Sequence, residues 1–299
     1  MSQNVLVELS DALADAAEKA GKATVLVNAR RRMPASGIAY ASDLILTADH
    51  VVEREDGIKV ILADGAEVSA RVTGRDAGSD LAVLKLERST HAVAEATKSP
   101  ARLGQIVLAL GRPSPDGIEA SLGTVSAIGG PIRTGRGGML ERYLRTDSIS
   151  YPGFSGGPLV AADGTVLGLN TSGLANGAAV TVPADIAWRI ADTLVQHGRI
   201  KRGYLGIRSQ TVDISEASQK ALQREQATGL LIVGVENSSP AAKGGLIVGD
   251  ILVGVAGEPV LHHDELFTRL NGDVVGKSVS IDLIRGGQPQ TLNVLIGEK

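Results

Sequence analysis

The chain contains no cysteine among its 299 residues. This absence excludes disulfide bonds, thiolate metal ligands and a cysteine nucleophile. Aromatic residues are also scarce, at 2% of the sequence, so aliphatic side chains must build the cores. No apolar run approaches the roughly 20 residues that cross a bilayer as a helix. The length is sufficient for two domains, each with its own core.

Strong charge of either sign is missing as well, since the formal net charge is −3. The composition therefore gives no sign of a nucleic-acid or membrane-surface partner. A secretory signal is not predicted, because a basic start is lacking and acidic residues from Glu8 to Glu18 interrupt any apolar stretch. We expect a cytoplasmic protein as the chain stands, or a periplasmic or cell-envelope protein if a signal has been removed.

The sequence Gly153-Phe154-Ser155-Gly156-Gly157 places a serine among glycines just before an apolar run. A nucleophilic serine needs a tight turn, and glycines allow the φ values that let backbone N–H groups converge on a developing oxyanion. Alone, the pattern is also ordinary turn composition. A catalytic interpretation therefore needs a base and an orienting acid elsewhere in the chain.

Two further residues supply these groups. His50 follows the apolar run 44–48, and Asp80 precedes the apolar run 81–86. Taken singly, each could be an ordinary structural histidine or a turn aspartate. The order His, Asp, Ser is that of chymotrypsin and differs from the orders in subtilisin and the α/β-hydrolases. The three together predict acyl transfer at Ser155.

These motifs, in this order, resemble those of the HtrA/Deg family of serine proteases from about Ala23 to the end of the chain. The resemblance implies that Ser155 is the nucleophile, that His50 is the general base and that Asp80 orients the imidazole. The N–H groups of Gly153 and Ser155 would form the oxyanion hole. The family resemblance also implies a chymotrypsin-like domain followed by a PDZ domain.

Two positions depart from the family pattern. Phe154 stands where the family commonly has asparagine, a change that leaves the backbone donors in place. Ser150 stands where the family often has an isoleucine that lines the specificity pocket, and Ile149 precedes it. Neither residue is acidic, so we do not expect cleavage after lysine or arginine. We expect small or aliphatic residues before the scissile bond, in a pocket that is shallower or more polar than usual.

Short β-type runs with turn signals between them fill the first two thirds of the chain. They predict strands near residues 23–29, 37–41, 44–48, 58–62, 67–72, 81–86, 103–110, 120–128, 143–146, 158–160, 165–170 and 178–182. Many short strands without intervening helices favour barrels or a sandwich. The resemblance selects a mainly β, trypsin-like fold of two six-stranded antiparallel β-barrels, with His50 and Asp80 in the first barrel and Ser155 in the second.

Helical spacing of apolar residues predicts an amphipathic helix over 4–20 and a second helix over 184–197. The first helix either packs on the protease domain or forms an oligomer contact. Many relatives form homotrimers through N-terminal aromatic residues, which this segment lacks. The expected division is an N-terminal helical segment at 1–22, a protease domain at 23–198, a linker at 199–202 and a PDZ domain at 203–299.

The segment from residue 203 resembles a bacterial PDZ domain. The resemblance implies that its carboxylate-binding loop and the strand that follows include Gly203, Tyr204, Leu205, Gly206 and Ile207. Backbone N–H groups of this loop would hold the terminal carboxylate of a peptide, and the next strand would add the peptide as an extra strand. A helix near 262–271 would form one wall of the groove, with Leu266 and Leu270 facing either the groove or the core.

Three other patterns are weaker. Residues 272–278 resemble a phosphate-binding loop but have the wrong glycine spacing and precede a strand. His262 and His263 are adjacent, so they cannot chelate a metal from one helix face. The glycine-rich loop 129–138 is either an activation loop or a plain hairpin loop. We therefore expect no cofactor and no metal.

The predicted function is that of an HtrA-type serine endopeptidase in protein quality control, which degrades unfolded or misfolded proteins. Its PDZ domain would bind peptide C-termini, either to tether substrates or to activate the protease. The alternatives are a non-proteolytic chaperone and a peptide-binding scaffold. An intact triad argues against both alternatives.

Overall fold

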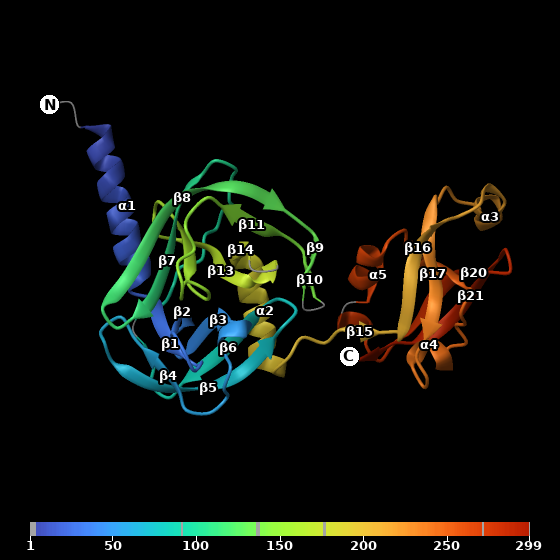
Figure 1. Ribbon diagram of the computed structural model, residues 1–299, viewed down its shortest axis with the longest axis horizontal. Helices are drawn as coiled ribbons and strands as arrows, with labels where there is room; N and C mark the ends of the chain where they lie inside the picture. The colour runs from blue at the N-terminus through green and yellow to red at the C-terminus, as the bar shows by residue number, and fades with distance from the viewer. Residues whose placement is uncertain (1–3, 91, 136–137, 176–177, 271, 299) are drawn as a thin grey trace. The chain divides into compact units, whose positions relative to one another are not determined.

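The computed structural model describes residues 4–90, 92–135, 138–175, 178–270 and 272–298. The chain divides into two compact units, Met1–Ile200 and Lys201–Lys299, which are described separately below. Figure 1 shows both units along the chain.

The first six strands, blue to cyan in Figure 1, close into an antiparallel barrel in the order β1-β2-β3-β6-β5-β4. They are β1 (Thr24–Asn28), β2 (Ala35–Ala41), β3 (Leu44–Ala48), β4 (Ile58–Ile61), β5 (Glu67–Asp76) and β6 (Leu81–Leu86). The barrel core is aliphatic, as the scarcity of aromatics requires, and includes Val25, Ile45 and Leu84. Closure by pairing of β1 with β4 leaves no open sheet edge.

The second barrel has the order β11-β14-β13-β12-β7-β8. Its strands are β7 (Ile106–Ser114), β8 (Gly117–Gly129), β11 (Tyr143–Thr146), β12 (Pro158–Ala161), β13 (Val166–Ala175) and β14 (Ala178–Pro183). The predicted fold of two six-stranded antiparallel barrels is therefore confirmed.

Part of the glycine-rich loop between β8 and β11 forms a two-stranded ribbon that was not predicted. Its strands are β9 (Ile132–Arg133) and β10 (Met139–Leu140). The Thr134 side chain stabilises the ribbon end, since its hydroxyl accepts from Gly138 N and donates to Gly78 O. Residues 136–137 of this loop lie outside the described residues.

Two helices complete the first unit: α1 (Val5–Gly21) and α2 (Ala184–His197). The last turns of α1 pack on the barrels through Ala16 and Ala20. Arg112 of β7 holds the end of α1, because its guanidinium donates to Gly21 O at 3.2 Å and to Thr24 O at 2.8 Å. No helix among the described residues combines the length and apolar character needed to cross a membrane.

The second unit contains a sheet of order β16-β17-β18-β20-β21, with β19 paired to β18, and a small ribbon of β15 with β22. Its elements are β15 (Gly203–Tyr204), β16 (Ile207–Asp213), α3 (Glu216–Leu222), β17 (Thr228–Val235), α4 (Pro240–Lys243), β18 (Ile251–Val255), β19 (Glu258–Pro259), α5 (His263–Arg269), β20 (Ser278–Arg285), β21 (Gln288–Leu295) and β22 (Gly297–Glu298). Leu266 and Leu270 are buried in the core, which settles the two orientations left open by their spacing. Strand β16 lies at one edge of the sheet.

Candidate active site

The histidine and the aspartate predicted from sequence form a tight pair. His50 lies in a 3₁₀ turn that follows β3, and Asp80 lies at a left-handed turn just before β6. His50 Nδ1 is 2.8 Å from Asp80 Oδ2, and the His50 backbone N–H donates to Asp80 Oδ1 at 2.9 Å. The carboxylate therefore fixes the imidazole with its proton on Nδ1, so that Nε2 is left as the basic nitrogen.

Asp80 is fully buried, yet its carboxylate is well supplied with donors. Besides the two bonds from His50, Oδ2 accepts a hydrogen bond from the Thr171 hydroxyl of β13. A buried carboxylate without such partners would strongly destabilise the fold. Thr171 therefore links the orienting acid of the first barrel to the second barrel.

Ser155 precedes β12 and lies beside residues 172–173 of β13. Its Oγ is 3.3 Å from Ser172 Oγ. A β-carbon added to Gly173 would lie 2.3 Å from Asp80 Oδ2 and 2.7 Å from His50 Nδ1. The second barrel thus brings Ser155 and the His50–Asp80 pair to the same segment of β13. Among the described residues, the hydrogen-bond partner of the Ser155 hydroxyl is Ser172 and not His50.

The turn that carries Ser155, here named the serine loop (residues 151–157), leaves two backbone donors available. Gly153 has φ +90°, and a β-carbon there would lie 2.7 Å from Pro113 Cβ. The N–H groups of Gly153 and Ser155 donate to no acceptor within the described part of the chain. These are the two donors that the sequence assigned to an oxyanion hole.

Two buried residues hold the serine loop in place. Ser36 of β2 donates its hydroxyl to Gly153 O at 2.7 Å and its N–H to Ser155 O at 3.1 Å. Phe154 is fully buried in the second barrel and packs edge-on against Tyr151, with ring centroids 5.3 Å apart. These contacts fix the carbonyls and the central side chain of the loop, while the N–H groups of Gly153 and Ser155 have no acceptor among the described residues.

A small cavity lies beside the serine loop, with about 10 Å³ of space open to the centre of a water molecule. Of the two predicted pocket residues, Ser150 lines it. Ile149 does not, and its side chain is 59% exposed. Asn170 and Thr181 also line it.

The predicted carboxylate loop (residues 203–207) has a similar arrangement in the second unit. Gly206 has φ +78°, and Leu205 is buried. The carbonyls of Leu205 and Gly206 accept from Ala241 N at 2.8 Å and Glu236 N at 2.9 Å. Within the described residues, the N–H groups of Leu205 and Gly206 have no acceptor, so they remain available to a ligand.

The strand that follows this loop is not entirely open. Ile207, half-buried, begins β16, whose other edge is paired with β17. His263, the first residue of α5, places Nε2 3.1 Å from Ser209 O and 3.2 Å from Ser209 Oγ. A peptide that pairs with β16 at Ser209 must therefore displace the imidazole.

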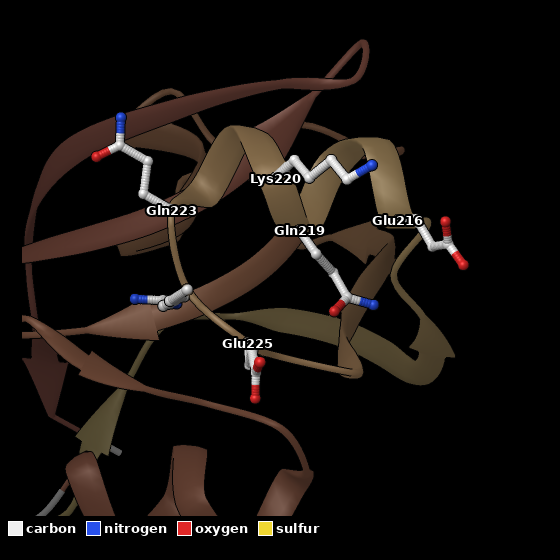
Figure 2. A pocket seen from close by; sticks show the side chains of 6 residues that line it. Glu216, Gln219, Lys220, Gln223 and Glu225 are labelled. Carbon is white, nitrogen blue, oxygen red and sulfur yellow. The ribbon is translucent and has the colours of Figure 1, made fainter.

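A wider depression of about 410 Å³ lies around α3 in the second unit and is lined by charged and amide side chains. Figure 2 shows Glu216, Gln219, Lys220, Gln223 and Glu225 around it. It contains none of the predicted site residues, and Gln219 is used internally, since Nε2 donates to Ile214 O at 2.9 Å. We assign no chemistry to it. Over the described ranges, no cluster of three or more histidine or acidic side chains has the arrangement of a metal site.

Sequence patterns did not identify the supporting residues Ser36, Thr171, Ser172 and Asn170. The sequence Asn170-Thr171-Ser172-Gly173 carries three polar side chains and a glycine in an apolar strand run. This interruption of the apolar pattern was the sequence signal that could have identified the supporting residues of β13.

Comparisons with known proteins agree with this geometry. The model of the trypsin-like peptidase domain matches residues 35–169, and that of the PDZ domain matches residues 203–296. A probable periplasmic DegP-like serine endoprotease of Rhizobium meliloti (strain 1021) is 34% identical over 278 residues, which is 90% of this chain and 54% of that protein. One of Halomonas elongata is 35% identical over 90% of this chain and 57% of that protein. The chain thus spans about half the length of these curated relatives.

Solved structures resemble nearly the whole chain. The serine endoprotease from Yersinia pestis has a TM-score of 0.80 at 28% identity and covers 96% of this chain and 98% of its own. The HtrA-type protease AlgW, solved with a decapeptide, has a TM-score of 0.80 at 27% identity, with the same coverage.

Proposed function

Since the chain belongs to the HtrA/Deg family of serine proteases, we propose that it is a serine endopeptidase whose catalytic residues are His50, Asp80 and Ser155. The observation that carries this proposal is the meeting of the His50–Asp80 pair and the Ser155 hydroxyl at residues 171–173 of β13. The serine loop that carries Ser155 also has two N–H groups without an acceptor among the described residues.

The proposed reaction is peptide-bond hydrolysis by acyl transfer. Ser155 Oγ attacks the scissile carbonyl while His50 Nε2 accepts its proton, and the imidazolium then gives that proton to the leaving amine. Asp80 holds Nδ1–H and stabilises the imidazolium. For this step the Ser155 hydroxyl must exchange its hydrogen bond with Ser172 for one to His50 Nε2.

The negative charge that develops on the scissile oxygen requires donors already in position. The N–H groups of Gly153 and Ser155 would supply them, and the loss of one such donor typically lowers the rate about 100- to 1000-fold. Ser36 and Phe154 would act as positioning residues, because Ser36 holds the carbonyls of the loop and Phe154 fills its core.

Degradation of an unfolded model protein such as β-casein tests the activity. Wild type should cleave it, and Ser155→Ala should lower cleavage by roughly 10⁶-fold. Ser99→Ala, on an exposed turn, is the matched control and should cleave like wild type. Equal cleavage by wild type and Ser155→Ala would reject Ser155 as the nucleophile. No cleavage by wild type, with or without added C-terminal peptides, would favour the chaperone or scaffold alternatives.

The proposal extends to peptide binding by the second unit. AlgW has been solved with a decapeptide and with a tripeptide, which supports peptide ligands for this chain. We propose that the carboxylate loop 203–207 binds a terminal carboxylate through the N–H groups of Leu205 and Gly206, and that β16 adds the peptide as a strand. A peptide with a free C-terminus should bind, and its C-terminally amidated form should not, as measured by fluorescence anisotropy.

Deletion of the proposed PDZ domain distinguishes a peptide that activates the protease from one that only tethers a substrate. A peptide activates only if it favours the active state of the protease. Removal of the proposed PDZ domain, residues 203–299 after a 199–202 linker, should abolish any stimulation by peptide. Stimulation that survives the deletion would rule out coupling through this domain.

The proposed compartment is the periplasm, because the curated relatives are named as periplasmic proteases. The cytoplasmic expectation has no support from these relatives. Fractionation of cells that express the full gene should place the protein with periplasmic markers.

A homo-oligomer is proposed from the first helix. Val5 and Leu6 at the start of α1 are 72% and 74% exposed, although they are apolar. Burial of such residues against other copies is favourable. Light scattering should give the mass of a homotrimer for wild type, and a lower mass for the double variant Val5→Ser, Leu6→Ser.

A further inference from the structure

The cavity beside the serine loop contains a buried amide with one unsatisfied end. Asn170 of β13 is 7% exposed, and its Nδ2 has no hydrogen-bond partner in the described part of the chain. Its Oδ1 accepts from Thr181 Oγ1 at 2.7 Å. A buried polar group without a partner destabilises a fold. Because Asn170 also lines the cavity, a group that enters the cavity can supply the missing partner.

The position of Asn170 connects this cavity to the nucleophile. The backbone of Asn170 is bonded to the serine loop in both directions, since its N–H donates to Gly157 O and its carbonyl accepts from Gly156 N, each at 2.8 Å. Two residues further along β13, Ser172 Oγ lies 3.3 Å from Ser155 Oγ. The cavity is also lined by Ser150, directly before the serine loop. The cavity therefore borders the segments that hold Ser155, which makes it the candidate position for the side chain before the scissile bond.

The lining of the cavity defines the side chain that fits. Its polar walls are the Asn170 amide and hydroxyls of serine and threonine, including Ser148, and its apolar walls are small. No charged residue lines it. With about 10 Å³ open to the centre of a water molecule, the space suits a small side chain and excludes a long or aromatic one.

We propose that this pocket selects a threonine or serine side chain before the scissile bond, and that Asn170 determines the choice; the inference rests on the proposed endopeptidase function. A hydroxyl group can both donate and accept a hydrogen bond. It can therefore pair with the Asn170 side chain whether the amide nitrogen or the amide oxygen faces the cavity. An aliphatic side chain of the same shape leaves that amide unpaired. The sequence predicted a small or aliphatic residue before the scissile bond. This proposal limits the residue at that position to a small one with a hydroxyl group.

The test uses two peptide substrates that differ only in threonine or valine before the scissile bond, because these side chains have nearly the same shape. Wild type should cleave the threonine peptide with a kcat/KM about 10- to 100-fold higher. Asn170→Leu keeps the size of the side chain and removes its hydrogen bonds. In this variant the threonine-to-valine ratio should fall to one or below.

A fluorophosphonate probe, which labels an activated serine, separates the two possible failures. Labelling of Ser155 with a threonine-to-valine ratio near one in wild type would overturn the inference alone. If wild type neither reacts with the probe nor cleaves either peptide, the proposed function fails and the inference falls with it. A ratio in Asn170→Leu equal to that in wild type would remove Asn170 as its origin. If thermal melting shows that Asn170→Leu does not fold, the threonine-to-valine ratio is compared between wild type and Asn170→Ala instead. An equal ratio in these two proteins would likewise remove Asn170 as its origin.

Discussion

The serine loop and the carboxylate loop, in different units of the chain, both leave backbone N–H groups without an acceptor among the described residues. Each loop has a glycine with a left-handed φ, +90° at Gly153 and +78° at Gly206. Each also has a buried apolar side chain next to that glycine, Phe154 in one and Leu205 in the other. In both loops the carbonyls are bonded internally, so the N–H groups are left to bind an anionic oxygen.

The two loops differ in what lies opposite these N–H groups. The serine loop carries its own nucleophile, and the His50–Asp80 pair lies at the same segment of β13 as Ser155. The carboxylate loop continues into the edge strand β16, whose backbone can pair with a peptide. In the proposed function, the same donor arrangement would serve transition-state stabilisation in one unit and ground-state binding in the other. Variants that affect one loop should leave the activity of the other unchanged.

The largest effect is expected from removal of the apolar anchor of the serine loop. Phe154→Ala should destabilise the first unit by about 3–5 kcal/mol, because it leaves a cavity in a filled core. It should also lower kcat/KM per folded molecule, because the loop loses its fixed position. Urea unfolding and peptide hydrolysis under native conditions measure the two effects.

The matched control is Leu167→Ala, in the same core cluster but outside the loop. It should destabilise by about 2–5 kcal/mol and retain the kcat/KM of wild type per folded molecule. Equal kcat/KM in Phe154→Ala and Leu167→Ala would mean that Phe154 contributes to stability alone.

The next effect concerns the oxyanion donors. In Gly153→Ala the added β-carbon would approach Pro113 Cβ to 2.7 Å, at a φ of +90° that alanine rarely adopts. The loop must shift, and we expect kcat/KM to fall about 100- to 1000-fold. Binding of a C-terminal peptide should not change. Gly104→Ala is the control, since its φ is +78° but its β-carbon would meet nothing within 4 Å. An unchanged rate in Gly153→Ala would exclude the Gly153 N–H as a donor.

The barrels could be predicted because their signals are local. Short apolar runs and turn residues gave every strand of both barrels, and the motifs around His50, Asp80 and Ser155 lie at strand ends. The family resemblance then selected two six-stranded barrels over a sandwich, a choice that local patterns do not determine. Helices α3 and α4 were not predicted, because seven and four residues are too few to show helical periodicity. Their serine N-caps, Ser215 and Ser239, and Pro240 at the start of α4 were local signals of helix starts.

The supporting residues of the site could not be predicted, because their partners are far away in the sequence. Thr171 bonds Asp80 across 91 residues, and Ser36 bonds Gly153 across 117 residues. Serine and threonine in a strand have no pattern that distinguishes such a role from an exposed position. The unpaired amide of Asn170 becomes visible only when the closed barrel shows that it is buried.

A smaller effect is expected in the carboxylate loop. A β-carbon at Gly206 would lie 2.4 Å from Ser239 Cβ, and its φ is +78°. Gly206→Ala should weaken C-terminal peptide binding about tenfold, as expected from 1–2 kcal/mol of backbone strain. Hydrolysis of a short peptide should be unaffected. Gly257→Ala, with φ +80° and no atom within 4 Å, should bind peptide like wild type. Fluorescence anisotropy titrations of wild type, Gly206→Ala and Gly257→Ala measure peptide binding. Normal binding by Gly206→Ala would mean that the terminal carboxylate of the peptide binds elsewhere.

The smallest effect concerns the ionisation of Tyr204 in the carboxylate loop. The hydrogen bond that Tyr204 donates to Glu236, with desolvation and the charge of Glu236, raises the pKa of Tyr204 above its ordinary value of 10.0. Because the folded-state pKa is the higher one, the associated stabilisation is fully present below pH 10 and is lost as the pH rises through the raised pKa. Absorbance at 295 nm, compared with Tyr204→Phe, identifies the transition of this residue. Glu236→Gln removes the charged acceptor and should return the pKa of Tyr204 toward 10.0, whereas an unchanged titration would show that Glu236 does not hold this loop residue in solution.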